Sequence, residues 1–251
     1  MKIMFLGDVH GSYPFMRAAI DATVNAQADT IIQAGDFGIW DHIQAGVDFL
    51  DRTNDLLERK DKWLIFVDGN HENFDRLYSI YPLDEESGFR PVRDRILHAP
   101  RGHAWDIDGL NFLAFGGASS IDGPDGPPWW GQARGLGNGW WPQERITESD
   151  VQRALEVTDQ IPIDVMVAHD CPEGVSIPGI TRGYPAGDAN RKAVRTVMDA
   201  SQPQLLVCGH YHRRHTAILN QTRIEILSSN EQKSGQAIFL ETAPMRLITD
   251  G

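Results

Sequence analysis

Polar side chains follow five of the apolar runs in this sequence. Asp8 and His10 come after "KIMFLG", and Asp36 comes after "IIQAG". Three later runs end in the same way, in Asn70 and His71, in His169, and in His210 and His212. Carboxylates and imidazoles at the ends of buried strands cost free energy unless something compensates their polarity. A metal ion would supply that compensation.

Each position also has a simpler interpretation. A single buried histidine is usually a hydrogen-bonded core residue, and a single Asp after Gly is usually a turn residue. The set as a whole argues otherwise, because five of the nine histidines lie at these run ends. A glycine also directly precedes four of the polar candidates, where a chain leaving a strand turns tightly, at Gly7, Gly35, Gly69 and Gly209.

The candidate ligands are Asp8, His10, Asp36, Asn70, His169, His210 and His212. Imidazole, carboxylate and amide donors without thiolate suit divalent manganese, iron, zinc, cobalt or nickel, and we expect manganese. Seven ligands exceed the needs of one ion. Two divalent metal ions that share a bridging carboxylate would use all of them and leave positions for water and substrate.

The elements that must position these ligands are short apolar strands alternating with helices. We expect strands at residues 2–6, 30–33, 63–67, 111–115, 164–168 and 205–208. Ser12 with Pro14 predicts a helix to Asn25, Asn73 a short helix to Tyr78, and Thr147 with Asp150 another. Asn190 is expected to cap a helix ending near Ala200. In such sheets ligands bind at the carboxyl ends of strands.

The second half of the chain contains hairpin patterns and one unusual segment. Asp108-Gly109 predicts a turn between two strands, and residues 216–248 alternate as further hairpins do, so we expect two packed sheets. Residues 116–145 form a loop insert rich in Trp, Gly and Pro. Its tryptophans either anchor the loop by packing or form a platform for a nucleobase or aryl group: Trp129, Trp130, Trp140 and Trp141.

Composition bounds the class of protein. With 251 residues we expect a single domain over 1–251, and the net charge of −12 opposes binding to membranes or long nucleic acids. The sequence shows neither a spanning apolar segment nor a secretory signal. Cys171 and Cys208 are too few for a disulfide framework, so we expect a reducing, cytoplasmic location.

The ordered motifs "GDVHG", "GD", "GNHE", "AHD" and "GHYH" resemble those of the calcineurin-like metallophosphoesterases. The stretch "GGASSID" followed by "WWPQERI" is similar to bacterial and phage members of this superfamily. The resemblance implies an α/β fold of four layers, α/β/β/α, with a two-metal centre. It implies that Asp8, His10 and His212 hold one ion, and that Asn70, His169 and His210 hold the other. Asp36 would bridge the ions, and His71 would protonate the leaving alkoxide.

The function expected from this resemblance is hydrolysis of a small phosphoester by in-line attack of a hydroxide shared between the two ions. The family's protein phosphatases continue their second motif to an arginine that binds phosphate, whereas residues 35–40 here read "GDFGIW". This absence favours phosphodiesters such as small or cyclic nucleotides over phosphomonoesters. A replacement cation would come from another loop, with four candidates: Arg134, Arg145, Arg182 and Arg213.

The alternatives are a phosphomonoesterase or serine/threonine-type protein phosphatase, a nuclease, and an inactive metal-binding scaffold. The net charge opposes a nuclease, and the full set of ligands opposes an inactive scaffold. The physiological substrate and the oligomeric state stay open.

Overall fold

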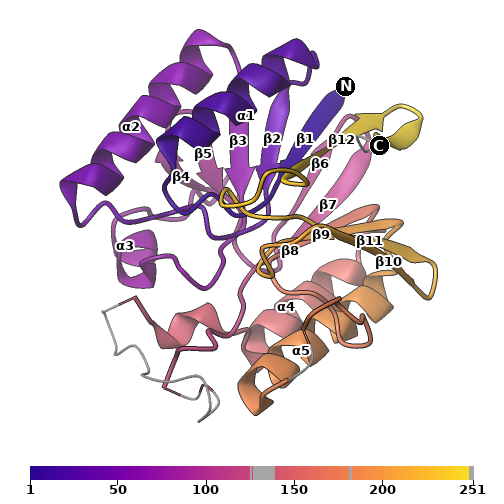
Figure 1. Ribbon diagram of the computed structural model, residues 1–251. Coiled ribbons are helices and arrows are strands. Elements are labelled where there is room, and N and C mark those ends of the chain that lie inside the picture. Colours follow the sequence, from indigo (N-terminus) through magenta and orange to yellow (C-terminus); the bar gives the residue numbers. More distant parts are fainter. Residues whose placement is uncertain (125, 127–138, 181–182, 249–251) are drawn as a thin grey trace.

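The computed structural model describes residues 1–124, 126, 139–180 and 183–248. Within this part of the chain, two mixed sheets pack against each other and helices cover both outer faces (Figure 1). The expected α/β/β/α arrangement is therefore confirmed.

The first sheet has the strand order β13-β12-β1-β2-β3-β5-β4 in the described residues. Strands β1, β2, β3 and β5 run parallel, while β12 is antiparallel to β1. The strands are β1 (Lys2–Leu6), β2 (Thr30–Gln33), β3 (Trp63–Phe66), β4 (Arg90–Arg93), β5 (Ile96–His98), β12 (Ala237–Thr242) and β13 (Met245–Ile248).

The second sheet has the order β10-β11-β9-β8-β7-β6 in the same part of the chain. Its four central strands are parallel, and an antiparallel strand flanks them at each edge. The strands are β6 (Ala104–Ile107), β7 (Leu110–Phe115), β8 (Val165–Ala168), β9 (Leu205–Cys208), β10 (His215–Leu219) and β11 (Thr222–Ile226).

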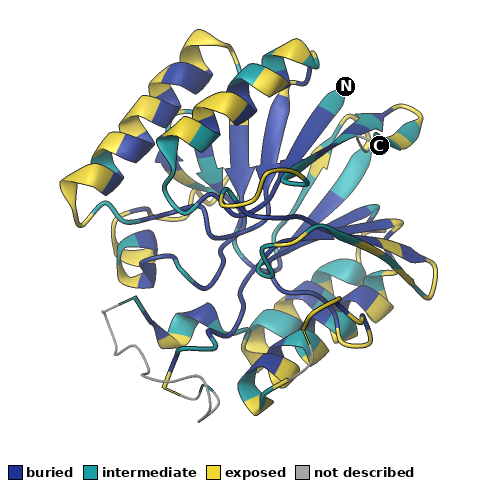
Figure 2. Cartoon of the chain, in the orientation of Figure 1, coloured by how far each residue is buried: buried dark blue, intermediate teal, exposed yellow. Residues whose placement is uncertain are grey.

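Helices α1 (Tyr13–Asn25) and α2 (Gln44–Arg59) cover the first sheet, and α4 (Glu148–Thr158) and α5 (Pro185–Ser201) cover the second (Figure 1). Three apolar clusters fill the spaces between these four layers, and the central one lies between the sheets. Residues of the central strands are largely buried, whereas the edge strands are partly exposed and the helices expose their outer faces (Figure 2). No helix in the described ranges has both the length and the apolar character needed to span a bilayer.

Local signals in the sequence explain several element boundaries. Thr147 and Asp150 form a reciprocal capping box at the start of α4. The side chain of Asn73 accepts from the Arg76 amide and caps α3 (Phe74–Ser79). Ser12 occupies the cap position of α1 without a side-chain bond, and Pro14 fits the first turn.

The prediction for Asn190 is wrong. Helix α5 begins at Pro185, so Asn190 lies within the helix. Its buried amide donates to Gly117 O and Asp170 Oδ2, and its oxygen accepts from the Ile146 amide. Asn190 therefore ties the helix to two loops instead of starting it.

Candidate metal centre

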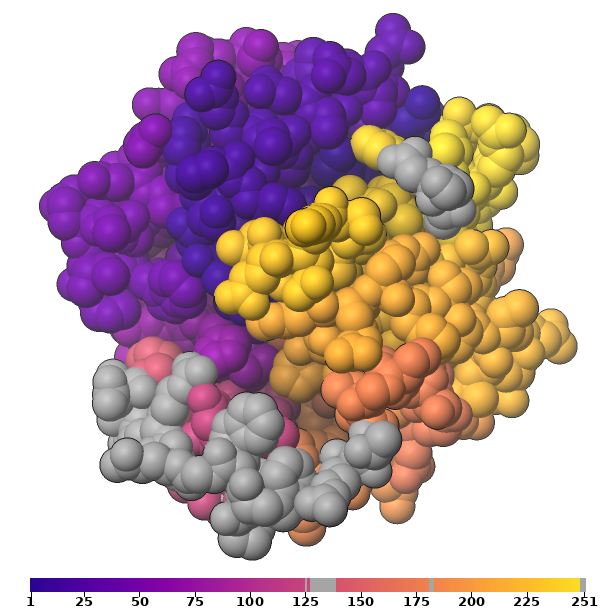
Figure 3. Space-filling model, viewed as in Figure 1, coloured from indigo at the N-terminus to yellow at the C-terminus, as the bar shows by residue number. Residues whose placement is uncertain are grey.

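The predicted ligands lie in loops that follow parallel strands of both sheets. Asp8, Asp36 and Asn70 come after β1, β2 and β3 of the first sheet. His169 comes after β8, and His210 and His212 come after β9, in the second sheet. Figure 3 shows the N-terminal part of the chain, in indigo and purple, lying directly against the C-terminal part, in orange and yellow. Segments distant in sequence therefore build one site.

One group of donors gathers around Asp8. Its Oδ2 lies 3.3 Å from Nε2 of His212, and the ring centroids of His212 and His10 are 5.0 Å apart. Asp8 is fully buried, and its carboxylate also accepts from the His210 amide at 3.1 Å. The described atoms thus bring together the three side chains expected to share one ion.

A second group gathers around Asn70. Its Oδ1 lies 3.1 Å from Nε2 of His169 and 3.0 Å from Nδ1 of His210. Asn70 and His169 are buried. These are the three side chains expected to share the other ion.

Asp36 lies between the two groups. Its Oδ2 is 3.3 Å from Nε2 of both His10 and His169. Its Oδ1 accepts from the amides of Asn70 at 2.9 Å and His71 at 2.8 Å, so both carboxylate oxygens are fixed. This is the position that a bridging carboxylate requires.

Four of the predicted ligands have a left-handed backbone, with φ of 49° at His10, 58° at Asp36, 70° at His210 and 52° at His212. Such conformations are uncommon outside glycine, and backbone strain of this kind concentrates at functional sites. They turn each chain sharply as it leaves its strand.

The preceding glycines allow the loops to approach closely. A Cβ at Gly35, where φ is +93°, would lie 2.3 Å from Nδ1 of His169. A Cβ at Gly69 would lie 2.1 Å from Oδ1 of Asp36, and one at Gly209 would lie 2.1 Å from Oδ1 of Asp8. These positions need glycine because the ligands themselves occupy the space.

The electrostatics of the centre favour cations. Burial lowers the pKa of His10, but the hydrogen bond and charge of Asp36, with the charge of Asp8, outweigh burial and raise it to about 9. The same balance raises the pKa of His169 to about 10. Burial raises the pKa of Asp36, and the surrounding histidines overcome this and hold it well below its ordinary value. The carboxylates therefore attract positive charge.

Further groups fix the orientation of the histidines, and the sequence analysis did not identify them. Nδ1 of His10 lies 3.1 Å from Asn230 Oδ1, and Nδ1 of His169 lies 2.7 Å from Ala34 O. Glu231 Oε2 is 3.6 Å from Nδ1 of His212. In each case the partner lies at Nδ1, and Nε2 faces the centre. Partners of this kind commonly orient the rings of metal-binding histidines. Asn230 follows β11 within "SSN", so the rule used for the other strand ends would have indicated it.

Glu72 hydrogen-bonds to the loops after β2 and β3, and it was likewise not predicted as part of the site. This buried carboxylate accepts from the amides of Phe37 at 2.7 Å, Gly38 at 3.3 Å and Gly69 at 2.6 Å. It therefore joins the loop after β2 to the loop after β3.

The donor set fits divalent metal ions. Ligand atoms come within 4.8 Å of one another in three overlapping groups of the described residues: Asp8, His10 and His212; His10, Asp36 and His71; and Asp8, Asp36 and His169. Nitrogen and oxygen donors converge without thiolate, since Cys171 and Cys208 are buried and belong to an apolar cluster.

Parts of the predicted insert can be placed. Trp141 packs in the apolar cluster beneath α1 and α2, and its Nε1 donates to Asp75 Oδ2 at 3.1 Å. Trp140 is also buried. For these two tryptophans the packing interpretation holds. Trp129, Trp130 and two of the candidate arginines, Arg134 and Arg182, lie outside the described residues.

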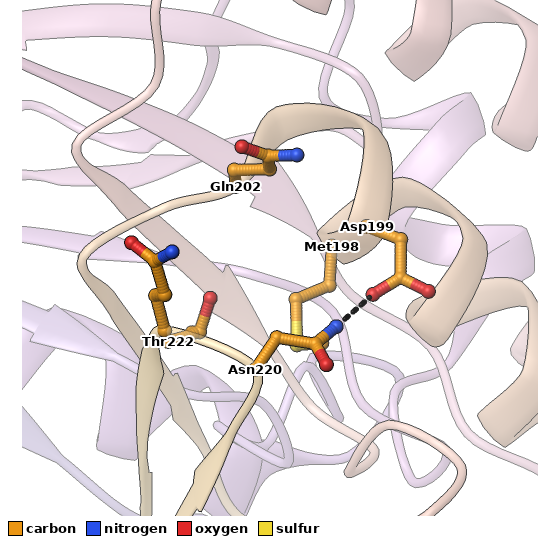
Figure 4. A pocket seen from close by; sticks show the side chains of 6 residues that line it. Met198, Asp199, Gln202, Asn220 and Thr222 are labelled. Atoms are coloured by element: carbon orange, nitrogen blue, oxygen red, sulfur yellow. Dashed lines mark hydrogen bonds between the residues drawn. The ribbon is translucent and has the colours of Figure 1, made fainter.

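The larger cavities lie away from this centre. One of about 330 Å³ lies between the end of α5 and the β10–β11 turn, where Asn220 donates to Asp199 at 3.0 Å (Figure 4). Another, of about 620 Å³, is lined by Tyr78, Arg90 and His103. A smaller cavity of about 200 Å³ reaches His210 beside Tyr184 and Tyr211.

Comparison with known proteins identifies the family. The sequence pattern of the calcineurin-like phosphoesterases matches residues 1–214. No curated protein sequence matches the chain.

The fold is similar to those of several solved structures. A protein of Thermus thermophilus has a TM-score of 0.61 at 12% identity, over 100% of this chain and 98% of its own. A dimetal phosphatase from Danio rerio has a TM-score of 0.58 at 13% identity, over 96% and 92%. A purple acid phosphatase from yellow lupin seeds has a TM-score of 0.53 at 10% identity, over 96% and 49%.

Proposed function

Because the chain belongs to the calcineurin-like phosphoesterase family and is thus a metal-dependent phosphate ester hydrolase, we propose that it hydrolyses small phosphodiesters at this centre. The observation that carries the proposal is the position of Asp36, whose Oδ2 is equidistant, at 3.3 Å, from His10 and His169. One carboxylate thereby joins the two groups of donors.

In this proposal Asp8, His10 and His212 hold one divalent ion, and Asn70, His169 and His210 hold the other. Asp36 serves both. Manganese is the expected metal, with iron, zinc, cobalt and nickel as alternatives that the same donors accept. Two bound divalent ions supply charge neutralisation at the phosphoryl oxygens and lower the pKa of the attacking water.

His71 is the proposed proton donor to the leaving-group oxygen. Its amide donates to Asp36 Oδ1 at 2.8 Å, and its carbonyl accepts from Trp40 Nε1 at 2.7 Å. The backbone is thus fixed on both sides, while the partly exposed imidazole lies 5.7 Å from the His10 ring. Histidine suits this role because its pKa is near neutral pH.

The preference for diesters rests on the loop after β2. Residues 35–40 contain no arginine. Phe37 and Ile39 are buried in the core, and Trp40 Nε1 donates to the His71 carbonyl. A phosphomonoester carries more negative charge than a diester and gains more from a bidentate arginine. The alternative is a phosphomonoesterase, including a serine/threonine-type protein phosphatase, with a cation from elsewhere.

Two of the candidate arginines are described. Arg213 Nη1 donates to the Pro178 carbonyl, at the edge of the second sheet. The guanidinium carbon of Arg145 lies 5.7 Å from the centroid of the Trp140 ring. Both arginines therefore stay candidates for a phosphate contact under the alternative.

The charge of −12 supports a small substrate rather than long nucleic acid, and it also opposes binding to anionic membranes. The free, buried cysteines Cys171 and Cys208 support the proposed cytoplasmic location.

The test is hydrolysis of an aryl phosphodiester and an aryl phosphomonoester by metal-stripped protein to which Mn²⁺ is restored. We expect turnover to require the metal, to favour the diester, and to be lost in Asp36→Ala. Asp84→Asn is the matched control, because this exposed carboxylate accepts only local bonds from Ser87 and Glu86.

A preference for the monoester would move the assignment to a phosphomonoesterase. Metal binding without turnover of either ester would favour the inactive scaffold.

A further inference from the structure

Among the seven predicted ligands, Asn70 alone carries an amide, whose oxygen can bind a cation and whose nitrogen cannot. In the structure Nδ2 donates to Oγ of Ser120 at 3.0 Å. The oxygen faces the centre, between His169 and His210. The orientation of the side-chain amide therefore decides whether Asn70 can serve as a ligand, because Oδ1 and not Nδ2 must face the centre.

A second hydrogen-bonded pair lies behind Asn70. The hydroxyl of Ser120 donates to Oε2 of Glu144 at 2.7 Å, and the Ser120 amide donates to Oε1 at 2.6 Å. Both carboxylate oxygens are thus occupied by one residue. Ser120 is 3% exposed and Glu144 is fully buried, so water does not compete for these bonds.

The single hydroxyl proton of Ser120 fixes the direction of the hydrogen bonds from Asn70 through Ser120 to Glu144. A serine hydroxyl has one proton, and an ionised carboxylate can only accept. Once Ser120 donates to Glu144, its oxygen can only accept from Asn70. The NH₂ group of Asn70 must then face Ser120. A flipped amide would place two acceptor oxygens in contact and turn the NH₂ group towards the centre.

The support for Glu144 also reaches the loop that carries Asn70. Arg101 donates to the carbonyls of Gln143 and Glu144 and forms an ion pair with Asp68 at 2.6 Å. Asp68 lies two residues before Asn70, and its carbonyl accepts from the Gly117 amide at 2.7 Å. Both ends of the 116–145 segment are thereby fastened to the β3 loop.

We propose that Ser120 and Glu144 are positioning residues, which hold the Asn70 amide with its oxygen towards the metal ions. The proposal rests on the proposed function only in requiring that the centre bind metal. It assigns a role to both ends of the tryptophan-rich segment, which the sequence alone presented as an accessory loop. Outer partners of this kind typically change metal affinity about 10–100-fold when removed.

The experiment is a calorimetric titration of Mn²⁺ into metal-stripped Ser120→Ala and wild type. It is run at pH 8, because burial, against the Ser120 hydrogen bonds, raises the pKa of Glu144 to about 7. We expect about 10–100-fold weaker binding at one of two sites. The matched control is Ser119→Ala, which removes a neighbouring buried hydroxyl that has no hydrogen-bond partner in the described structure. Its affinity should equal that of wild type.

A second comparison separates orientation from general damage. In Asn70→Asp either side-chain oxygen can bind metal, so adding Ser120→Ala to that variant should not weaken metal binding. An equal loss in the wild-type and Asn70→Asp backgrounds, or equal affinities of Ser120→Ala and Ser119→Ala, would overturn the proposal.

Thermal unfolding of the metal-free proteins monitors folding. If Ser120→Ala does not fold, Glu144→Gln takes its place. Its side-chain amide has one oxygen in place of two, so it cannot reproduce the bonds from both the amide and the hydroxyl of Ser120. Wild-type metal affinity in Glu144→Gln would overturn the proposal. Binding is measured without substrate, so wild type that binds two ions but hydrolyses no ester contradicts the proposed function alone. Wild type that binds no metal contradicts both.

Discussion

The carboxylate of Asp36 lies 3.3 Å from the imidazole of His169, although the two residues follow strands of different sheets. Asp36 leaves β2 and His169 leaves β8, so this contact joins the carboxyl ends of both sheets across the sandwich. Gly35 makes it possible, because any side chain there would occupy the space of the His169 ring. The centre is therefore a property of how the two sheets pack.

Gly35→Ala should disrupt this junction. The new Cβ would lie 2.3 Å from His169 Nδ1, at a φ of +93°. We expect a loss of about 2–4 kcal/mol in the free energy of unfolding, from strain and overpacking together, and a loss of metal binding. Denaturant unfolding and Mn²⁺ titration measure the two effects.

Gly109→Ala is the matched control for Gly35→Ala. Its φ is +83°, but nothing lies within 4 Å of the added Cβ. It should cost only the backbone strain, about 1 kcal/mol, and leave metal binding intact. Equal effects of the two substitutions would show that crowding against His169 is unimportant.

His71→Gln should reveal proton donation through its dependence on the leaving group. An alkoxide needs a proton as it departs, whereas a nitrophenolate does not, so kcat should fall about 10²–10⁴-fold for alkyl esters and less than tenfold for nitrophenyl esters. Steady-state kinetics on a series of leaving groups test this. A uniform loss across the series would instead assign His71 a role in substrate or metal positioning.

Glu72→Gln should destabilise the loops after β2 and β3. The carboxylate accepts from three buried amides, and a glutamine would turn its NH₂ group against at least one of them. We expect a loss of about 1–3 kcal/mol in unfolding free energy. Because burial raises the pKa of Glu72 to about 7, together with the charge of Asp36, the denaturation is measured at pH 8.5. The exposed Glu86→Gln should be neutral, and a similar stability of both variants would contradict the assignment.

His103 should make stability depend on acid pH. Burial, with a smaller contribution from the charge of His98, lowers its pKa from 6.5 to about 4, so the folded protein holds the neutral ring. Between pH 6.5 and 4 the unfolded chain binds the proton and the folded chain does not, so stability falls as the pH decreases. With partial exposure of the ring, the loss should be about 1–2 kcal/mol.

The variant His103→Gln should flatten this part of the pH profile, as measured by unfolding free energies from pH 7 to 4. The ring stacks with Trp105 and contacts Phe89, so the variant should also be less stable at pH 7. An unchanged slope would show that other groups cause the acid dependence.

The parts of the fold that the sequence predicts best are the buried strands. The ranges 2–6, 30–33 and 205–208 match β1, β2 and β9, because runs with polar ends are distinctive. The start of helix α2 gave no such signal, because the residue at its cap position is Ile43, whose apolar side chain cannot accept a capping hydrogen bond. The short strands β4 and β5 were also missed, because Pro91 and interspersed arginines hide the alternation.

The candidate site shows the same limit. Its predicted ligands follow strands and could be found one strand at a time. Ser120 and Glu144 act only through each other and through Asn70, across 24 and 50 positions of the sequence. The prediction for Asn190 failed for a related reason. Its side chain bonds to distant loops, and the neighbouring sequence alone does not distinguish that role from a helix cap.

The most direct test of the central claim is the number of Mn²⁺ ions bound per chain by metal-stripped wild type and by Asp36→Ala, measured by equilibrium titration. Since Asp36 joins both groups of donors, two ions should bind to wild type, and Asp36→Ala should weaken both sites or lose one. Binding of one ion or none by wild type, or unchanged two-ion binding in Asp36→Ala, would contradict the account.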